Sequence, residues 1–119
     1  MIKPTSTYLT IYQGATFSET FTWVARDTNI PVNLTGYSAR LQVKNNYDGL
    51  VILELNTTNG GIVFPSPLTS GVINLFMSAA STSVLNFSMA IWDLILIASD
   101  GTVTRLLNGR MALSPGVTL

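Results

Sequence analysis

The sequence contains neither cysteine nor histidine. Disulfides and thiolate metal sites are therefore excluded, and so are Ser-His-Asp catalysis, Cys-His catalysis and the common zinc sites. A chain without cysteine also fits a protein that is made and assembled in a reducing cytoplasm. We expect no metal and no cofactor.

Charge is scarce as well. Six basic and six acidic residues give a net charge of zero, and charged residues make up 10% of the chain, against about a quarter in soluble domains generally. No basic stretch could neutralise a row of phosphates, so neither nucleic acid nor an anionic membrane is an expected partner. The longest apolar run, Met89–Ala98, is interrupted by Asp93 and is far shorter than the roughly 20 residues of a membrane helix.

Apolar residues, in contrast, make up 47% of the 119 residues. With so few charges, much of the surface must be formed by Thr, Ser and Asn or be covered by other protein, which is typical of a chain built for an assembly. The length predicts a single domain over residues 1–119. Residues 1–6 are expected to form a short mobile arm without a secretion signal, followed by a first strand over Thr7–Tyr12.

Alternating apolar and polar residues predict short strands along most of the chain. The clearest example is Phe17–Trp23, in which aromatic residues alternate with Ser and Thr and only Glu19 interrupts the apolar side. The only helix candidate is the Ser- and Thr-rich stretch at 78–85. Seven or eight strands without alternating helices favour an all-β sandwich or barrel. The remaining predicted strands are Tyr37–Lys44, Leu50–Leu55, Ile62–Phe64 and Gly71–Met77.

A long hairpin over Phe87–Leu113 organises the prediction. Asp100-Gly101 separates two apolar runs and favours a two-residue type I′ turn, and counting back from this turn places Trp92 opposite Gly109, which leaves room for the indole. One face of the hairpin is the better candidate for the core. The predicted core side chains are Phe17, Phe21, Trp23, Leu41, Val43, Trp92, Leu94 and Leu96.

The other face of the hairpin carries apolar side chains where a solvated sheet would be polar. We expect this face to be covered, either by another strand or loop of this chain or by a neighbouring subunit. On the same face Asp93 lies diagonal to Arg110, which predicts a structural ion pair across the two strands. The predicted interface residues are Ile91, Ile95, Ile97 and Leu106.

The carboxylates do not form an obvious catalytic set. A glycosidase needs two carboxyl groups that face each other across a sugar, whereas Asp27, Asp48 and Asp100 are better explained as turn formers. Glu19 and Asp93 lie on predicted strands, where pairing with arginine explains them better than catalysis. We therefore expect no enzyme and assign no catalytic residue.

Five short segments of the sequence form a recognisable pattern. They are Gly14–Phe21, Val32–Val43, Trp92–Leu94, Ser99–Gly109 and Leu113–Thr118. Together they resemble a known family, small structural proteins of tailed bacteriophages related to the N-terminal domain of the upper baseplate protein of lactococcal phages. In this sequence Ala15 stands in an acidic position of the family pattern, and Trp92 stands where Tyr is usual. The resemblance implies an immunoglobulin-like antiparallel β-sandwich that serves as a building block of the virion.

Three functional hypotheses follow. The first is a non-enzymatic tail, baseplate or fibre-attachment adaptor in a virion assembled in the host cytoplasm, with other virion proteins and copies of itself as partners. The second is a decoration protein of the capsid. The third is a carbohydrate-binding module, because β-sandwiches often present aromatic platforms. With Trp23 and Trp92 assigned to the core, Tyr12 and Tyr47 remain as possible sugar contacts.

Overall fold

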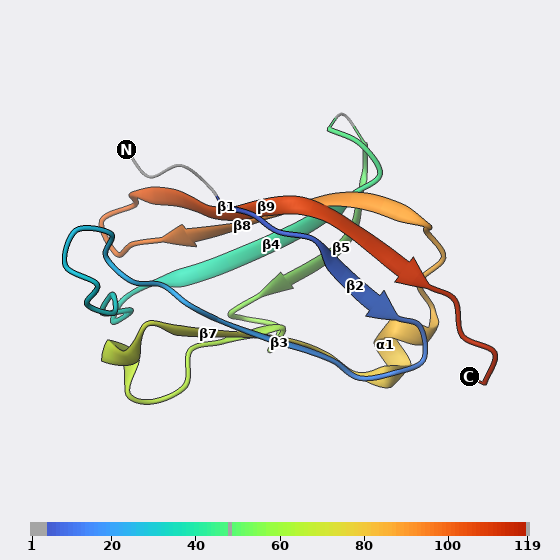
Figure 1. Ribbon diagram of the computed structural model, residues 1–119, viewed down its shortest axis with the longest axis horizontal. Helices are drawn as coiled ribbons and strands as arrows, with labels where there is room; N and C mark the ends of the chain where they lie inside the picture. The colour runs from blue at the N-terminus through green and yellow to red at the C-terminus, as the bar shows by residue number, and fades with distance from the viewer. Residues whose placement is uncertain (1–4, 48, 119) are drawn as a thin grey trace.

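The protein folds as two β-sheets packed face to face (Figure 1). The computed structural model describes residues 5–47 and 49–118. The larger sheet has the order β1-β9-β8-β4-β5, with β2 also paired to β9, and the smaller sheet has the order β3-β7-β6. The strands are β1 (Thr5–Ser6), β2 (Leu9–Tyr12), β3 (Phe17–Thr22), β4 (Ser38–Lys44), β5 (Val51–Asn56), β6 (Ile62–Val63), β7 (Val72–Met77), β8 (Met89–Ile97) and β9 (Val103–Ser114).

Among the described residues the chain crosses between the sheets four times, from β2 to β3, from β3 to β4, from β5 to β6 and from β7 to β8. The last crossing contains the short helix α1 (Ala79–Ser83), which lies within the predicted helix, and the loop before β7 contains the 3₁₀ turn η1 (Leu68–Ser70). In variable-type immunoglobulin domains, a smaller sheet packs against a larger sheet that carries additional edge strands. This protein has the same arrangement, with a smaller sheet of three strands and a larger sheet in which β5 is added beside β4. The fold is therefore an immunoglobulin-like β-sandwich, as expected.

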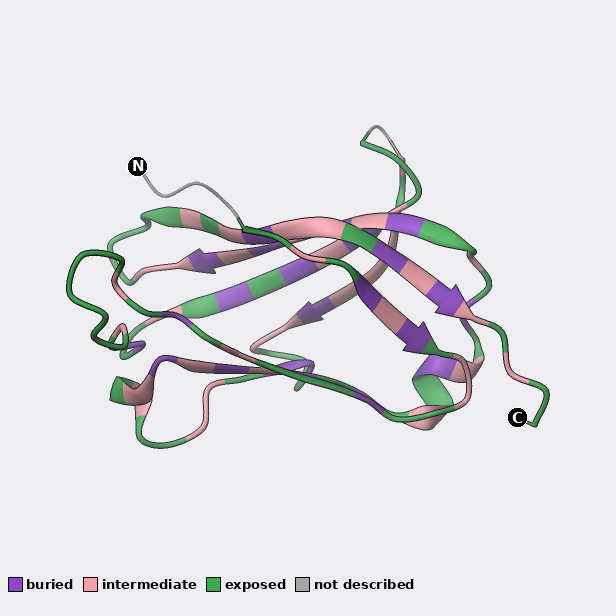
Figure 2. Cartoon of the chain, viewed as in Figure 1, coloured by how far each residue is buried: buried purple, intermediate pink, exposed green. Residues whose placement is uncertain are grey.

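The core lies between the two sheets, where alternate residues of each strand are buried (Figure 2). Leu41, Val43 and Leu94 are fully buried at its centre. The predicted core is confirmed for seven of its eight residues, because Phe17, Trp23, Trp92 and Leu96 are buried too. Phe21 is only partly buried and packs at the margin of the core. The reason is that β3 is at the edge of its sheet.

The β8–β9 hairpin has the predicted partners over most of its length, including Trp92 opposite Gly109. The predicted two-residue turn is wrong. Ala98 N–H donates to Thr102 O at 2.8 Å, which closes a three-residue loop over 99–101. The extra loop residue is compensated by a bulge at Leu106, because Ile95 pairs with Arg105 whereas Leu94 pairs with Leu107. The loop is one residue longer than predicted, and the bulge adds one residue to β9. These two offsets cancel beyond the bulge, so the pairs there are the predicted ones.

Gly109 is required for a different reason from the one predicted. A Cβ atom at this position would collide with the backbone carbonyl of Thr7, and its φ of 155° is one that other residues rarely adopt. Thr7 N–H donates to Asn108 O at 2.7 Å, so the N-terminal segment lies directly against β9 at this point. The missing side chain makes room for this segment and not for the indole of Trp92.

The N-terminal prediction needs a second correction. Thr5–Ser6 belongs to the larger sheet as β1, parallel to Leu107 and Asn108 of β9, so these two residues are not part of an arm. The other residues of the expected arm, 1–4, lie outside the described residues. The expected strand over Thr7–Tyr12 begins only at Leu9, because the chain leaves the ladder where it passes Gly109. Within residues 5–47 and 49–118 the sheets contain nine strand segments, and β1 and β2 pair in parallel with β9.

Candidate interaction surface

Three of the four predicted interface residues lie on the outer face of the larger sheet, which we define as the side that points away from the smaller sheet. Along β8 the residues alternate strictly, so that Ile91, Asp93, Ile95 and Ile97 are half-buried between fully buried neighbours. The cross-strand pairs extend this face over β4, β5 and β9. The structure thus places Ile91, Ile95 and Ile97 on one surface. Leu106, the fourth predicted interface residue, is the extra residue of the β9 bulge and packs against the buried core instead.

An apolar ridge runs down the middle of this face, formed by Ile91, Ile95 and Ile97. All three side chains are half-buried although no second layer of strands lies on this side of the sheet among the described residues (Figure 1). Long cationic side chains flank the ridge, since Arg40 and Arg105 pair with Ile95 from the two neighbouring strands. Alkyl stems of such residues can cover apolar surface while their charged ends stay in water.

The predicted ion pair between Asp93 and Arg110 is wrong. The partner of Asp93 is Arg105, whose Nε lies 3.5 Å from Oδ2. The Leu106 bulge is the cause, because it turns Arg105 onto the outer face opposite Ile95, while Arg110 lies opposite Ile91. Both side chains of the pair are substantially exposed, so we expect it to contribute less than about 1 kcal/mol to stability.

A shallow hollow of about 280 Å³ opens on the outer face beside the ridge. Its floor and walls come from β4, β8 and β9, and Tyr47 approaches from the loop between β4 and β5. The lining combines the apolar side chain of Ile91 with the amides of Gln42 and Asn108 and the Asp93–Arg105 pair. The hollow is open and mixed in polarity, which suits contact with another surface better than enclosure of a small ligand.

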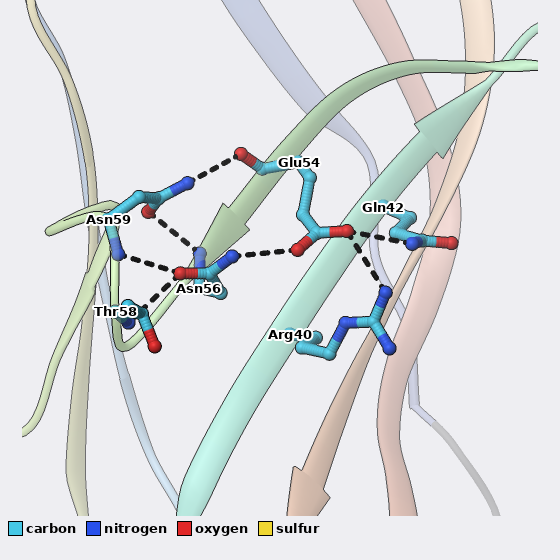
Figure 3. Close-up of polar contacts among 6 residues, drawn as sticks. All are labelled: Arg40, Gln42, Glu54, Asn56, Thr58 and Asn59. Atoms are coloured by element: carbon cyan, nitrogen blue, oxygen red, sulfur yellow. Dashed lines mark hydrogen bonds and ion pairs between the residues drawn. The ribbon is translucent and has the colours of Figure 1, made fainter.

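Glu54 anchors a polar network at the β5 edge of the same face (Figure 3). One carboxylate oxygen accepts hydrogen bonds from Gln42 Nε2 at 2.8 Å and Arg40 Nη2 at 3.1 Å, and the other accepts from Asn56 Nδ2 at 2.7 Å. These bonds, led by that of Gln42 and assisted by the charge of Arg40, lower the pKa of Glu54 from 4.5 to about 2. Glu54 therefore stays ionised over the ordinary pH range.

The network continues into the turn after β5. Asn56 Oδ1 accepts hydrogen bonds from the N–H groups of Thr58 and Asn59, and Asn59 Oδ1 accepts one from the N–H group of Asn56 (Figure 3). Asn59 Oδ1 also accepts from Gly61 N–H at 2.8 Å. Asn59 Nδ2 also donates to the backbone oxygen of Glu54 at 3.1 Å. Side chains thus satisfy backbone groups on the free side of β5, which protects this edge of the sheet.

The aromatic residues do not form a sugar-binding platform of tryptophans. Trp23 and Trp92 are buried at 9% and 3% exposure. Trp23 packs edge-on against Tyr37 at 5.7 Å between ring centroids, and the Trp92 indole N–H donates to Arg110 O at 3.1 Å. Tyr12 and Tyr47 are exposed as expected. They come from the ends of different strands, and only Tyr47 borders the hollow.

Three acidic side chains, those of Glu54, Asp93 and Asp100, are held in local ion pairs or hydrogen bonds. Among residues 5–47 and 49–118, no three His, Cys, Asp or Glu side chains gather where they could hold a metal ion. Glu54 and Asp93 are each engaged by arginine, and Asp100 accepts from Thr102 N–H at 2.9 Å in the hairpin loop. That backbone hydrogen bond lowers the pKa of Asp100. The helices in the described part of the chain are too short and too polar to span a bilayer.

The Glu54 network is the feature that sequence reasoning missed. Its signal is the Asn-Thr-Thr-Asn-Gly-Gly run over 56–61 directly after a strand, because asparagine side chains commonly bond backbone groups two or three residues ahead. That run predicted only a turn. The convergence of Gln42, Arg40 and Asn56 on Glu54 depends on the β4–β5 register, and that register includes a bulge near Lys44 that nothing in the sequence marks.

The sequence matches no family model and no curated protein. Solved structures do show the fold. A chicken TCR chain superimposes with a TM-score of 0.55 at 10% sequence identity, over 97% of this chain and 56% of that one. This agreement places the protein in the class of immunoglobulin-like β-sandwiches.

Two further structures are more distant. Extracellular domains 3–5 of Drosophila OTK match with a TM-score of 0.41 at 12% identity, over 92% of this chain and 33% of that chain. CopC from Methylosinus trichosporium OB3b matches with a TM-score of 0.39 at 12% identity, over 68% of this chain and 66% of that chain. The protein spans little more than half of the TCR chain, and at these identities the likeness concerns the fold alone.

Proposed function

We propose that this protein is a non-enzymatic structural component of a bacteriophage particle. It acts as a tail, baseplate or fibre-attachment adaptor that binds other virion proteins and copies of itself. The observation that carries the proposal is the apolar ridge of Ile91, Ile95 and Ile97 on an outer sheet face that no other layer of the described chain covers.

Three features support a role in assembly. The ridge lies on the long central strand β8, which gives a contact surface a rigid support. Charged residues are few and balanced, so burying the surrounding surface against a partner desolvates few charges. The resemblance to small tailed-phage proteins supplies the setting, because its segments fall on β3, β4, β8 and β9, the strands that define the sandwich.

The test of the setting is the number of copies in purified phage particles, measured by quantitative mass spectrometry against the major capsid protein. A few to a few dozen copies support an adaptor of the tail, baseplate or fibre joint. Hundreds of copies would instead identify a capsid decoration protein. Absence from the particle would refute a structural role in the virion.

The test of the surface is a charge placed on the ridge. Ile95→Lys should damage particle assembly, because the new ammonium group would have to be desolvated in the contact. Val84→Lys is the matched control, since Val84 is an exposed aliphatic residue at the end of α1, away from the ridge. Intact, infectious particles that carry Ile95→Lys would show that this face is not the interface.

The carbohydrate-binding alternative now depends on Tyr47 and the hollow next to it, because both tryptophans are buried. Fluorescence measurements separate it from the adaptor proposal. Blue-shifted emission protected from iodide is expected for Trp23 and Trp92, whereas rapid quenching of both would restore the aromatic platform that a glycan site needs.

A further inference from the structure

The smaller sheet ends in an open strand. β3 forms one edge of the order β3-β7-β6, and the preceding strands β1 and β2 pair with β9 of the larger sheet. The space beside β3 that a neighbouring N-terminal strand could have filled is therefore empty of strands in the described part of the chain. Five of the six β3 residues are exposed or half-exposed (Figure 2).

The hydrogen-bond pattern shows which backbone groups of β3 face outward. Trp23 N–H donates to Gly71 O at 2.8 Å, and this pair is in register with the β3–β7 ladder. Hydrogen-bonded and non-hydrogen-bonded pairs alternate in antiparallel sheets, so Phe17, Glu19 and Phe21 bond to β7. The N–H and C=O groups of Ser18, Thr20 and Thr22 consequently point away from the sheet.

The other free edges are short or blocked. β6 has only two residues, and β1 and β2 are separated by the kink at Gly109. On β5 the Asn59 side chain bonds both Glu54 O and Asn56 N–H. β3 carries no proline, lysine or bulge over its six residues, which are among the usual devices that keep an edge strand from pairing. Its one charged side chain is the exposed Glu19.

We propose that two copies of this protein join their β3 strands antiparallel about a twofold axis at Thr20, which makes one continuous sheet from the two smaller sheets. In this register Thr20 pairs with its own copy and Ser18 pairs with Thr22 of the partner copy. All the outward N–H and C=O groups of the three residues are then satisfied, with about six backbone hydrogen bonds between the copies. The partner is a second copy because β3 is complementary to itself.

The side chains select the same register. With the axis at Thr20, hydroxyl-bearing residues face each other on the outer side, and such pairs are favourable in antiparallel sheets. On the inner side Glu19 lies opposite Phe21 of the partner copy. A shift that centres the axis on Glu19 would place two carboxylates directly opposite each other, which is unfavourable, and would leave fewer outward groups paired.

The first experiment is sedimentation velocity on the purified full chain, with concentrations up to about 1 mM, the weak end of specific association. The wild-type protein should form a reversible dimer. Thr20→Lys should weaken it at least about tenfold, because two ammonium groups would face each other about 5 Å apart across the axis. Thr20 is exposed, so we expect this variant to fold, and near-UV circular dichroism checks it.

Asn74→Lys is the matched control. Asn74 lies opposite Thr20 on β7, and its Oδ1 accepts the Thr20 hydroxyl at 2.9 Å, so both variants lose the same side-chain hydrogen bond. In the proposed dimer the two lysines at 74 would be about 15 Å apart, three strand spacings, which is beyond the screening length of about 8 Å at physiological salt. Asn74→Lys should therefore dimerise like the wild type.

A second measurement needs no variant. Amide hydrogen exchange followed by NMR should show that the N–H groups of Ser18, Thr20 and Thr22 become protected as the concentration rises, whereas the exposed N–H groups of the 99–101 loop should not. A protein that stays monomeric to about 1 mM would overturn the proposal. A dimer that Ile95→Lys disrupts and Thr20→Lys leaves intact would also overturn it, and that result would assign self-association to the outer face of the larger sheet instead.

Discussion

Thr82 is the residue whose substitution tests the packing of this fold most sharply. It is the only polar side chain among the buried residues of the described chain. Its hydroxyl accepts a hydrogen bond from Gly14 N–H at 3.0 Å and can donate to Ala15 O at 2.9 Å. The bonds join α1 to the turn between β2 and β3, and so they connect the crossing segment to the strands of both sheets.

Thr82→Val replaces the hydroxyl with a methyl group of similar size and leaves a backbone donor and a backbone acceptor without their partner. Gly14 is half-buried and Ala15 is exposed, so water can satisfy the Ala15 carbonyl and the main cost is the unpaired Gly14 N–H. An unsatisfied group of this kind costs about 1–3 kcal/mol, and we expect the free energy of unfolding to fall by about that amount. Thr82→Ser keeps the hydroxyl and loses one methyl group, for which about 1 kcal/mol is expected. The valine variant should therefore be the less stable of the two.

Urea unfolding followed by fluorescence measures the difference, because Trp23 and Trp92 are both buried and should report on loss of the core. With a denaturant slope of about 1.5 kcal/mol/M, the midpoint of Thr82→Val should fall by roughly 1–2 M. If the valine variant were as stable as the serine variant, the hydroxyl would not join α1 to the β2–β3 turn, and the reasoning would be refuted.

Two further predictions concern the larger sheet. Gly109→Ala should destabilise the fold by about 3 kcal/mol or more, because the Thr7 carbonyl occupies the space of the new Cβ. The midpoint of urea unfolding measures this loss, and an unchanged midpoint would contradict the close approach of Thr7. Glu54 has a pKa lowered to about 2, so its stabilisation is present above pH 4.5 and disappears as the pH falls toward 2. Its side chain is 28% exposed, so Glu54→Gln should lose only about 1 kcal/mol at pH 7. The difference in unfolding free energy between wild type and Glu54→Gln should shrink between pH 5 and pH 2, and a constant difference would exclude the carboxylate network as its source.

The alternation of apolar and polar residues was sufficient to predict the sandwich and most of its core. Residues that alternate between the core and the surface of a strand also alternate in polarity along the sequence. Leu41, Val43, Leu94 and Leu96 occupy every second position of their strands, and all are buried. Phe21 shows where this logic stops, because alternation tells which side of a strand a residue takes but not how close the strand lies to the sheet edge.

The errors at the candidate surface have a common origin in bulges. Asp93 pairs with Arg105 because Leu106 is an extra residue in β9, and the loop at 99–101 adds the residue that balances it. A bulge changes the relative positions of side chains across strands without changing the apolar pattern on either side of it. Predictions that depend on which residues face each other are therefore less secure than predictions of strand and core.

The pairing of β1 and β2 determines how many surfaces the protein can offer. Both strands lie alongside β9, where Gly109 allows the Thr7 backbone to approach. Because they pair with β9 and not with β3, β3 has no neighbouring strand on one side. The apolar ridge and the open β3 edge belong to different sheets, so one protein can use both at once. A dimer joined through β3 would carry two ridges, and two weak contacts made together hold an assembly far more firmly than either alone. Because the two sites share no contacts, the effects of Ile95→Lys and Thr20→Lys on their own interfaces should be independent.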